Sequence, residues 1–168
     1  MPAERVTLRR LRPGDLMTLQ AYRNDPEVGR YQGWEPMTDA AAAAMIAEMA
    51  AAPCPAPGDW VQIAIADAAT DELLGDIGLH VSASGGEAEL GITLAPSAQG
   101  KGLAAEAARA LIGMLREHSQ VRRLVGITDV QNTASARLLE RLGMTFEAEE
   151  EIIFRGQPCV EARYALAL

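Results

Sequence analysis

A glycine-rich turn between a strand-like run and a helix-like run constrains the fold of this chain most strongly. The run Glu87–Pro96 is apolar and β-branched, and the run from Ala105 to Glu117 has helical periodicity. Between them stands Gln99-Gly100-Lys101-Gly102-Leu103-Ala104. Glycine lets the backbone approach a ligand closely, and the first turn of a helix leaves N–H groups unpaired. Because these N–H groups and the helix dipole favour an anion, the turn predicts a backbone site for a phosphate-bearing ligand.

The same turn also fits a tight strand-to-helix connection that binds nothing. It contains no G-x-x-x-x-G-K-[ST] pattern and no third glycine at the dinucleotide spacing. These two absences exclude a P-loop and a dinucleotide fingerprint as the reason for the turn.

A second strand-to-helix unit follows further along the chain. Residues 121–130 have the composition of a strand, and residues 131–144 have the pattern of a helix. Asn132 is a good N-cap and Gly143 is a good helix stop. The apolar stripe between them consists of Leu138, Leu139 and Leu142.

With both units in this order, the chain resembles the GCN5-related N-acetyltransferase (GNAT) superfamily, which binds acetyl-CoA. Its Q-x-x-G-x-A pattern is met by Gln99, Gly102 and Ala104. Its second signature is met by Asn132, Ser135 and Gly143. The stretches 6–15 and 22–31 look like the Rim-type branch, the ribosomal-protein N-terminal acetyltransferases and their relatives.

The resemblance covers nearly the whole chain and implies its fold. That fold is α/β, with a mostly antiparallel, twisted central sheet of about seven strands and helices on both faces. A splayed gap is expected between the fourth and fifth strands. The expected strands are Val6–Leu11, Asp59–Asp67, Leu73–Val81, Glu87–Leu94, Arg122–Thr128, Phe146–Phe154 and Cys159–Leu166, with the last two joined by a turn at residues 156–158. The expected helices are Pro13–Tyr22, Thr38–Ala52, Gly102–Glu117 and Asn132–Leu142.

Length and composition narrow the class of protein further. The 168 residues predict a single N-acetyltransferase domain over 1–168. No apolar stretch approaches the roughly 20 residues of a membrane span, and no signal-peptide pattern stands at the N-terminus. Cys54 and Cys159 match no metal spacing, so two free thiols in a cytoplasmic, bacterial-type protein without a metal are expected.

The net charge of −8 disfavours nucleic acid as a partner. It fits a cationic amine that is steered toward the protein, although acidity for solubility alone is the alternative.

The resemblance implies which residues bind acetyl-CoA. The backbone of Gln99, Gly100, Lys101, Gly102, Leu103 and Ala104 would hold the pyrophosphate. The edge of Ile92, Thr93 and Leu94 would hold the pantetheine arm, with a backbone N–H near Ile92 as oxyanion donor. Asn132 would bond the same arm through its side chain. A solvated lysine is the alternative for Lys101, and a pure N-cap is the alternative for Asn132.

Catalysis departs from the pattern of the family at one position. Many relatives place a tyrosine seven residues after the asparagine, where this chain has Leu139. The resemblance to Rim-type relatives implies that the matching serine, Ser135, replaces this tyrosine as proton donor to the departing thiolate or as its hydrogen-bond partner. The alternative is an ordinary helix serine that bonds a backbone carbonyl. Glu89 is the candidate general base, because strand alternation puts Glu87 and Glu89 on one face. The alternative for Glu89 is a solvent-facing carboxylate.

Aromatic residues are the candidates for the acceptor side. Tyr31 and Trp34 are expected to line the pocket together with Glu89, whereas Trp60 is expected in the core. The acceptor is a primary amine, either a protein N-terminus or a small molecule. The competing function is an acyl-CoA-binding sensor or regulatory protein with little catalysis. A homodimer is compatible with the Rim-type resemblance.

Overall fold

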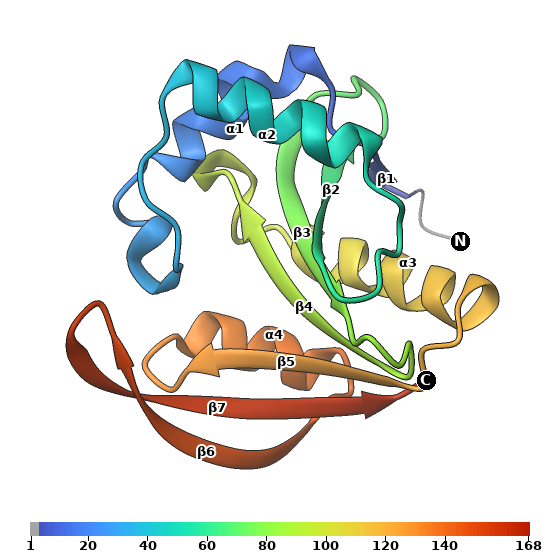
Figure 1. Cartoon of the computed structure of the whole chain (residues 1–168), viewed down its shortest axis with the longest axis vertical. Coiled ribbons are helices and arrows are strands. Elements are labelled where there is room, and N and C mark those ends of the chain that lie inside the picture. Colours follow the sequence, from blue (N-terminus) through green and yellow to red (C-terminus); the bar gives the residue numbers. More distant parts are fainter. Residues whose placement is uncertain (1–3) are drawn as a thin grey trace.

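The computed structural model describes residues 4–168 as one seven-stranded sheet with helices around it (Figure 1). The strands are β1 (Val6–Arg9), β2 (Trp60–Asp67), β3 (Leu73–Val81), β4 (Glu87–Leu94), β5 (Arg123–Asp129), β6 (Thr145–Phe154) and β7 (Gln157–Ala167). The helices are α1 (Leu16–Arg23), α2 (Asp39–Ala51), α3 (Leu103–His118) and α4 (Thr133–Arg141). Three 3-10 turns are η1 (Pro13–Asp15), η2 (Gly29–Tyr31) and η3 (Pro96–Ala98). None of the helices within residues 4–168 is long and apolar enough to span a membrane.

The sheet opens in its middle. Its order is β1-β2-β3-β4-β5-β7-β6, and β4 with β5 is the parallel pair among antiparallel neighbours. Pairing between them runs from Glu87 opposite Arg123 to Leu90 opposite Gly126 and then stops, although both strands continue. The expected gap between the fourth and fifth strands is therefore confirmed, and Figure 1 shows the two strands diverging.

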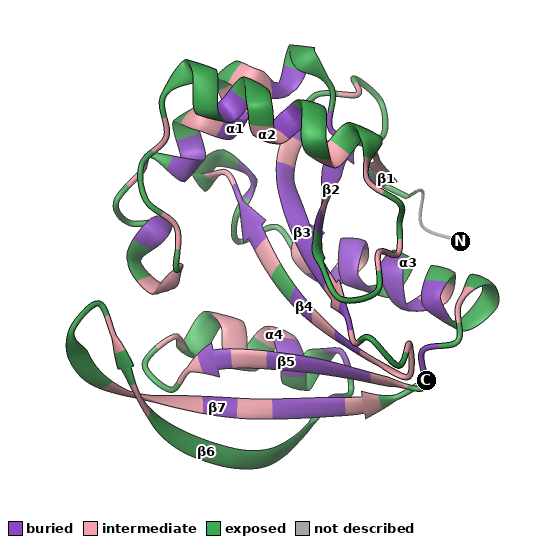
Figure 2. Ribbon diagram, in the orientation of Figure 1, coloured by how far each residue is buried: buried purple, intermediate pink, exposed green. Residues whose placement is uncertain are grey.

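Side-chain alternation distributes the core over both faces of the sheet. On β2, Ile63 and Ile65 pack in the cluster that contains α3, whereas Ala64 packs with residues of α1 and α2. Figure 2 shows the buried residues concentrated in β2, β3, β5 and the inner side of α3. Helices therefore cover both faces of the N-terminal half of the sheet.

A buried polar cluster ties α1 to β3. Asp76 is 2% exposed and accepts hydrogen bonds from the Tyr22 hydroxyl and, at 2.9 Å, from Nη2 of Arg23. Burial raises the pKa of Asp76, and the adjacent Arg23 charge opposes that shift. Trp34 covers the guanidinium of Arg23 at 4.2 Å and donates its indole N–H to the Arg23 carbonyl. The segment after α1 is thus fastened to the sheet.

Three expectations about local structure are wrong. The final hairpin turns at Arg155-Gly156, not at residues 156–158, because both residues have positive φ and Phe154 pairs with Gln157. Pro158 lies inside β7 and opposite Ile153 of β6. The other edge of β7 pairs with β5 only from Glu161 onward, so a proline at 158 breaks no pairing with β5. Residues 13–15 form a 3-10 turn before α1. Trp60 is 45% exposed and lies against His80 instead of filling the core.

Candidate functional site

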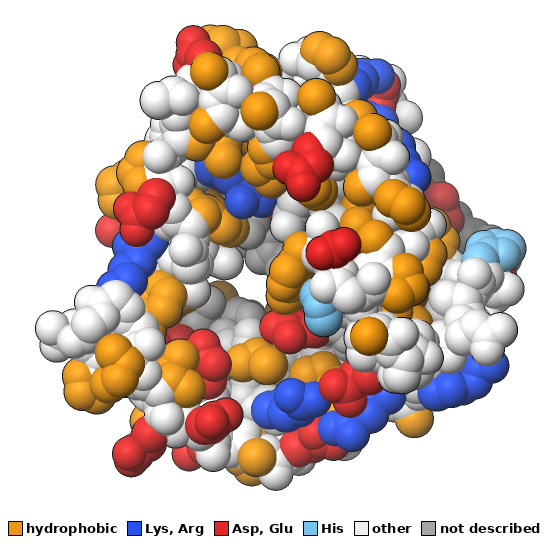
Figure 3. Space-filling view, in the orientation of Figure 1, with side chains coloured by type: hydrophobic (Ala, Val, Ile, Leu, Met, Phe, Trp, Pro, Cys, Tyr) orange, Lys and Arg blue, Asp and Glu red, His pale blue; other side chains and the backbone are white. Residues whose placement is uncertain are grey.

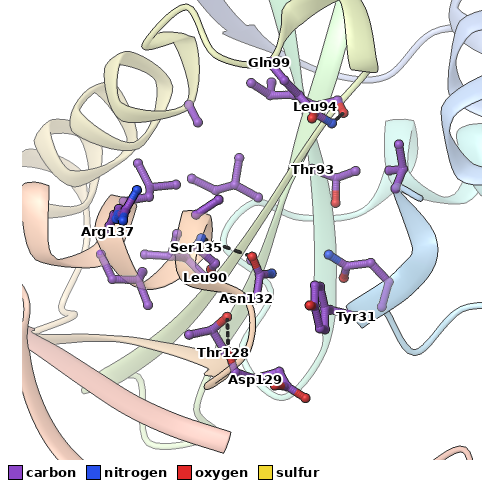
Figure 4. A pocket seen from close by; sticks show the side chains of 18 of the residues that line it. Tyr31, Leu90, Thr93, Leu94, Gln99, Thr128, Asp129, Asn132, Ser135 and Arg137 are labelled. Carbon is purple, nitrogen blue, oxygen red and sulfur yellow. Dashed lines mark hydrogen bonds between the residues drawn. The ribbon is translucent and has the colours of Figure 1, made fainter. Parts of the chain in front are cut away.

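A cavity of about 650 Å³ occupies the gap between β4 and β5. Its walls come from β4, the glycine-rich turn, the start of α3, the end of β5, α4 and the segment around Tyr31 (Figure 4). Figure 3 shows a hollow on this face of the molecule, beside β4. Of the predicted binding residues, the lining includes Tyr31, Ile92, Thr93, Leu94, Gln99, Gly100, Gly102, Leu103, Ala104, Asn132 and Ser135. Lys101, Trp34 and Glu89 are outside it.

One end of the cavity suits an anion. Gly100 and Gly102 have φ of +73° and +80°, and no atom lies within 4 Å of a Cβ built on Gly100. Within residues 4–168, the N–H groups of Leu103 and Ala104 in the first turn of α3 have no hydrogen-bond partner. A side chain at Gly100 would fill the open space beside those donors, whereas a Cβ built on Gly102 would lie 3.6 Å from Nη2 of Arg5.

Two arginines of α4 also line the cavity. Arg137 and Arg141 are four residues apart and therefore share one face of the helix. Figure 4 shows Arg137 on the side of the cavity opposite Tyr31. Sequence reasoning missed both, although their spacing after the Asn132 cap is visible in the printed sequence.

The free edge of β4 presents backbone groups to the gap. Ala95 donates its N–H to the Leu74 carbonyl, which lies just before Gly75 on β3. Because backbone direction alternates along a strand, the N–H and C=O of Ile92 and Leu94 point away from β3 and into the gap. Gln99 donates its side-chain amide to the Leu94 carbonyl at 3.0 Å, so the predicted ligand residue Gln99 also fixes the end of β4.

The start of α4 presents two polar side chains. Asn132 caps the helix, because its Oδ1 accepts the N–H of Ser135 at 3.2 Å (Figure 4). Within residues 4–168 the NH₂ of Asn132 has no hydrogen-bond partner and is available to donate into the cavity. Within the described chain the Ser135 hydroxyl has no hydrogen-bond partner. It therefore does not bond a backbone carbonyl of its own helix, which was the alternative to a catalytic role. Leu139 is 4% exposed and packs over Gly126, where a Cβ would meet its Cδ2 at 2.5 Å.

The opposite end of the cavity is acidic. Its lining includes Glu27, Asp129 and Glu161, none of which was predicted. Asp129 on β5 lies opposite Glu161 on β7, which lies opposite Glu150 on β6, so three acidic residues stand side by side. Burial and the nearby Asp129 and Glu150 charges raise the pKa of Glu161. We call Asp129, Glu161 and Glu150 the acidic row.

The carboxylates further back on the same face are neutralised. Arg163 bonds Glu87 at 2.9 Å, and Arg123 lies 3.4 Å from Glu87. Both arginines also reach Glu147. No Lys or Arg side chain within residues 4–168 forms an ion pair with a member of the acidic row. Like charges directly opposite one another destabilise a sheet, so the row favours a bound cation.

Glu89 lies between these two groups on β4. It is opposite His80 on β3, and Gly91, the next residue on its face, lines the cavity. Burial raises the pKa of Glu89, and the neighbouring His80 and Arg163 oppose that shift. The weaker effects of the Glu161 and Glu87 charges add to the rise in pKa. Glu89 therefore borders the cavity and, within residues 4–168, has no hydrogen-bonded or ion-pair partner.

Comparison with known proteins gives concordant matches. Residues 5–145 match the profile of the acetyltransferase (GNAT) domain. A protein from Bacillus licheniformis named uncharacterized N-acetyltransferase p20 is 32% identical over 145 residues, 86% of this chain and 81% of that protein.

Solved structures share the fold at lower identity. An acetyltransferase (GNAT family) from Bacillus anthracis has a TM-score of 0.86 at 22% identity, covering 99% of this chain and 97% of the other. Spermidine N-acetyltransferase from Vibrio cholerae, solved with CoA and spermine, has a TM-score of 0.82 at 21% identity, covering 98% and 96%.

Proposed function

The chain belongs to the GNAT acetyltransferase family, and from that premise we propose that it is an acetyl-CoA-dependent N-acetyltransferase acting on a cationic primary amine. One observation carries the proposal. A single cavity runs from unpaired backbone donors and arginines at one end to uncompensated carboxylates at the other. The first end suits phosphates, and the second suits an ammonium group. The Rim-type branch is part of the proposal and rests on the sequence of residues 6–31.

The residues present fit acetyl-CoA. The positive-φ glycines leave the cradle that a phosphate would fill, and Arg137 with Arg141 supplies positive charge beside it. The unpaired groups of Ile92 and the free amide of Asn132 would hold the extended arm. Acetyl-CoA supplies an acetyl group already activated as a thioester. The N–H of Ile92 is available to donate to a carbonyl oxygen, and the Ser135 hydroxyl is available to give a proton to a thiolate.

The protonation state of the amine decides whether a base is needed. A lysine-like amine of pKa ~10.4 costs roughly 4–5 kcal/mol to deprotonate at pH 7, whereas an α-amine at ~7.8 costs about 1 kcal/mol. We assign Glu89 as the base that takes this proton, directly or through water in the space over Gly91, where no described atom lies within 4 Å of an added Cβ. The raised pKa of Glu89 brings it closer to that of the amine, which favours proton transfer.

Ligand stabilisation and turnover test the proposal together. At 100 times its Kd, CoA should add about 2.7 kcal/mol of stability, which raises the Tm by roughly 5–11 °C. Thiol release from acetyl-CoA is then measured with a panel of amines. The absence of a thermal shift at millimolar CoA would refute the binding site. A shift without acetyl transfer to any amine would favour the acyl-CoA sensor, for which Leu139 in place of a tyrosine is the supporting feature.

Glu161→Gln tests the acidic row. Removing one charge should raise the KM for spermidine about twofold to fivefold, as expected for loss of a partly exposed ion pair worth up to about 1 kcal/mol. The same variant should be more stable at neutral pH by about 0.2–1 kcal/mol, because a like-charge pair is removed. The pKa of Glu161 is raised in the folded state, so the wild type loses stability as the pH rises through that pKa. Below about pH 4.3, the ordinary pKa of glutamate, Glu161 is protonated in both the folded and the unfolded state. The stability difference between the variant and the wild type should therefore vanish there.

The matched control is Glu151→Gln, which removes one charge from the opposite face of β6. It should leave the KM for spermidine within about twofold of the wild type. An equal rise in KM for both variants would mean that net charge, and not the acidic row, attracts the amine.

A further inference from the structure

The turn between β6 and β7 is bonded to a segment far away in the sequence. Nη2 of Arg155 donates to the carbonyls of Gln32 and Trp34, at 2.9 Å each. Gln32 and the neighbouring Phe154 both line the cavity. The bonds therefore join two separate walls of the cavity, and we call this pair of bonds the Arg155 clamp.

The clamp completes a ring around the acceptor side. The halves of the sheet part after Leu90 and Gly126, so β3 and β4 form one wall and β5, β7 and β6 form the other. On the first side, Trp34 is fastened to Arg23, which is fastened to Asp76 on β3. On the second side, Arg155 extends from the end of β6. The clamp connects these two chains of contacts across the gap.

The backbone of Arg155 has an unfavourable conformation that the turn by itself does not explain. A two-residue hairpin loop with positive φ at both residues favours asparagine or glycine at its first position. Arg155 stands there at φ +50°, where a side chain other than asparagine or aspartate is disfavoured. Asparagine would suit the turn better, but its side chain is too short to reach two carbonyls of another segment. The presence of an arginine at this position is therefore explained by its contact with residues 32–34 and not by the conformation of the turn.

We propose that the Arg155 clamp determines acceptor specificity by keeping this ring closed, so that the protein selects slender, unbranched amines and excludes branched or bulky ones. The inference rests on the proposed N-acetyltransferase function and narrows its acceptor class. A linear aminoalkyl chain passes through a closed ring and brings its distal ammonium groups beside Asp129 and Glu161. An amine on a folded protein surface, or on a branched scaffold, requires the ring to open.

The experiment compares two acceptors of equal charge, linear spermidine and branched tris(2-aminoethyl)amine. The test variant is Arg155→Asn, which suits the left-handed turn and removes the clamp. Arg30→Ala is the matched control, because Arg30 is an exposed arginine of the same segment that lies over Tyr31 and does not bridge to the hairpin. Thiol release gives kcat and KM for each acceptor. Hydrogen–deuterium exchange of residues 29–37 reports the clamp without reference to activity.

The wild type should prefer spermidine by about tenfold or more in kcat/KM. Arg155→Asn should reduce that preference at least about fivefold, by lowering the KM for the branched amine with little change in kcat for spermidine. It should also speed exchange in residues 29–37, whereas Arg30→Ala should change neither quantity. An unchanged preference in Arg155→Asn, or an equal loss with both acceptors, would overturn the proposal. Failure of the proposed function differs from these results, because no variant would then acetylate any amine.

Discussion

Gly102→Val is expected to lower the affinity for CoA by about a hundredfold or more. Gly102 has φ +80° and is the N-cap of α3, and a Cβ built on it would lie 3.6 Å from Nη2 of Arg5, beside the first-turn N–H groups. A valine side chain there would keep phosphate oxygens away from those donors. Each hydrogen bond to a charged group contributes about 1.5–3 kcal/mol, so the loss of two such bonds is sufficient for this effect. Isothermal titration with CoA measures the change.

A second left-handed glycine separates blocked binding from backbone strain. Gly143 has φ +83°, no atom lies within 4 Å of a Cβ built on it, and it is outside the cavity lining. Gly143→Val should therefore cost about 1–2 kcal/mol of stability, as much backbone strain as Gly102→Val. It should leave CoA affinity within about threefold of the wild type. If Gly102→Val binds CoA as tightly as Gly143→Val does, the phosphate site lies elsewhere in the molecule.

Glu89→Gln is expected to lower kcat/KM for spermidine by about 10²–10⁴-fold at neutral pH, the usual contribution of a general base. A base acts only when it is ionised and the amine is protonated. The loss should therefore be largest between the raised pKa of Glu89 and the pKa of the amine. Below the first value the wild type also slows, and above the second value the amine no longer needs a base. The acidic limb of the kcat/KM profile should accordingly end at the raised pKa of Glu89 in the wild type, whereas in the variant it should continue up to the pKa of the amine.

Two further variants make this result specific. Glu87→Gln changes a carboxylate on the same face that is engaged by Arg123 and Arg163, and it should alter kcat/KM less than about threefold. Ser135→Ala should lower kcat with little change in CoA affinity, because a thiolate exists only late in the reaction. Free thiols have pKa ~8.5, so this effect should be smaller than that of Glu89→Gln with a lysine-like amine. Full activity in a Glu89→Gln, Ser135→Ala double variant would show that neither residue is catalytic.

The local parts of the fold follow from local patterns. The bounds of β3 and β4 coincide with the segments expected from alternation and flanking turns, and Thr38 caps α2 through the N–H of Ala41. Each of these features depends on residues a few positions apart. The position of the turn at Arg155 was predicted wrongly because only the local pattern was used. Glycine and proline are typical turn residues, and both follow Arg155 in the sequence.

Side chains whose role depends on distant partners were harder to place. Trp34 was expected in the acceptor pocket, but it is not among the residues that line the cavity, and the guanidinium and carbonyl of Arg23 hold its ring. Glu89 was expected at the substrate site, and it borders the cavity without lining it. Arg137 and Arg141 were within reach of sequence reasoning, because a predicted helix with a predicted cap fixes which residues share a face.

The sequence by itself determined the order of strand, glycine turn and helix, the capping Asn132, and the family to which these belong. These features depend on backbone geometry at single positions, which the residue types Gly and Asn constrain directly. Only the tertiary structure decided that Asp129, Glu161 and Glu150 form one row, and that Arg155 meets carbonyls 121 and 123 residues away. Strand register decides the row, since a shift of one residue would turn each of its side chains to the other face, and the approach of two distant segments decides the contacts of Arg155.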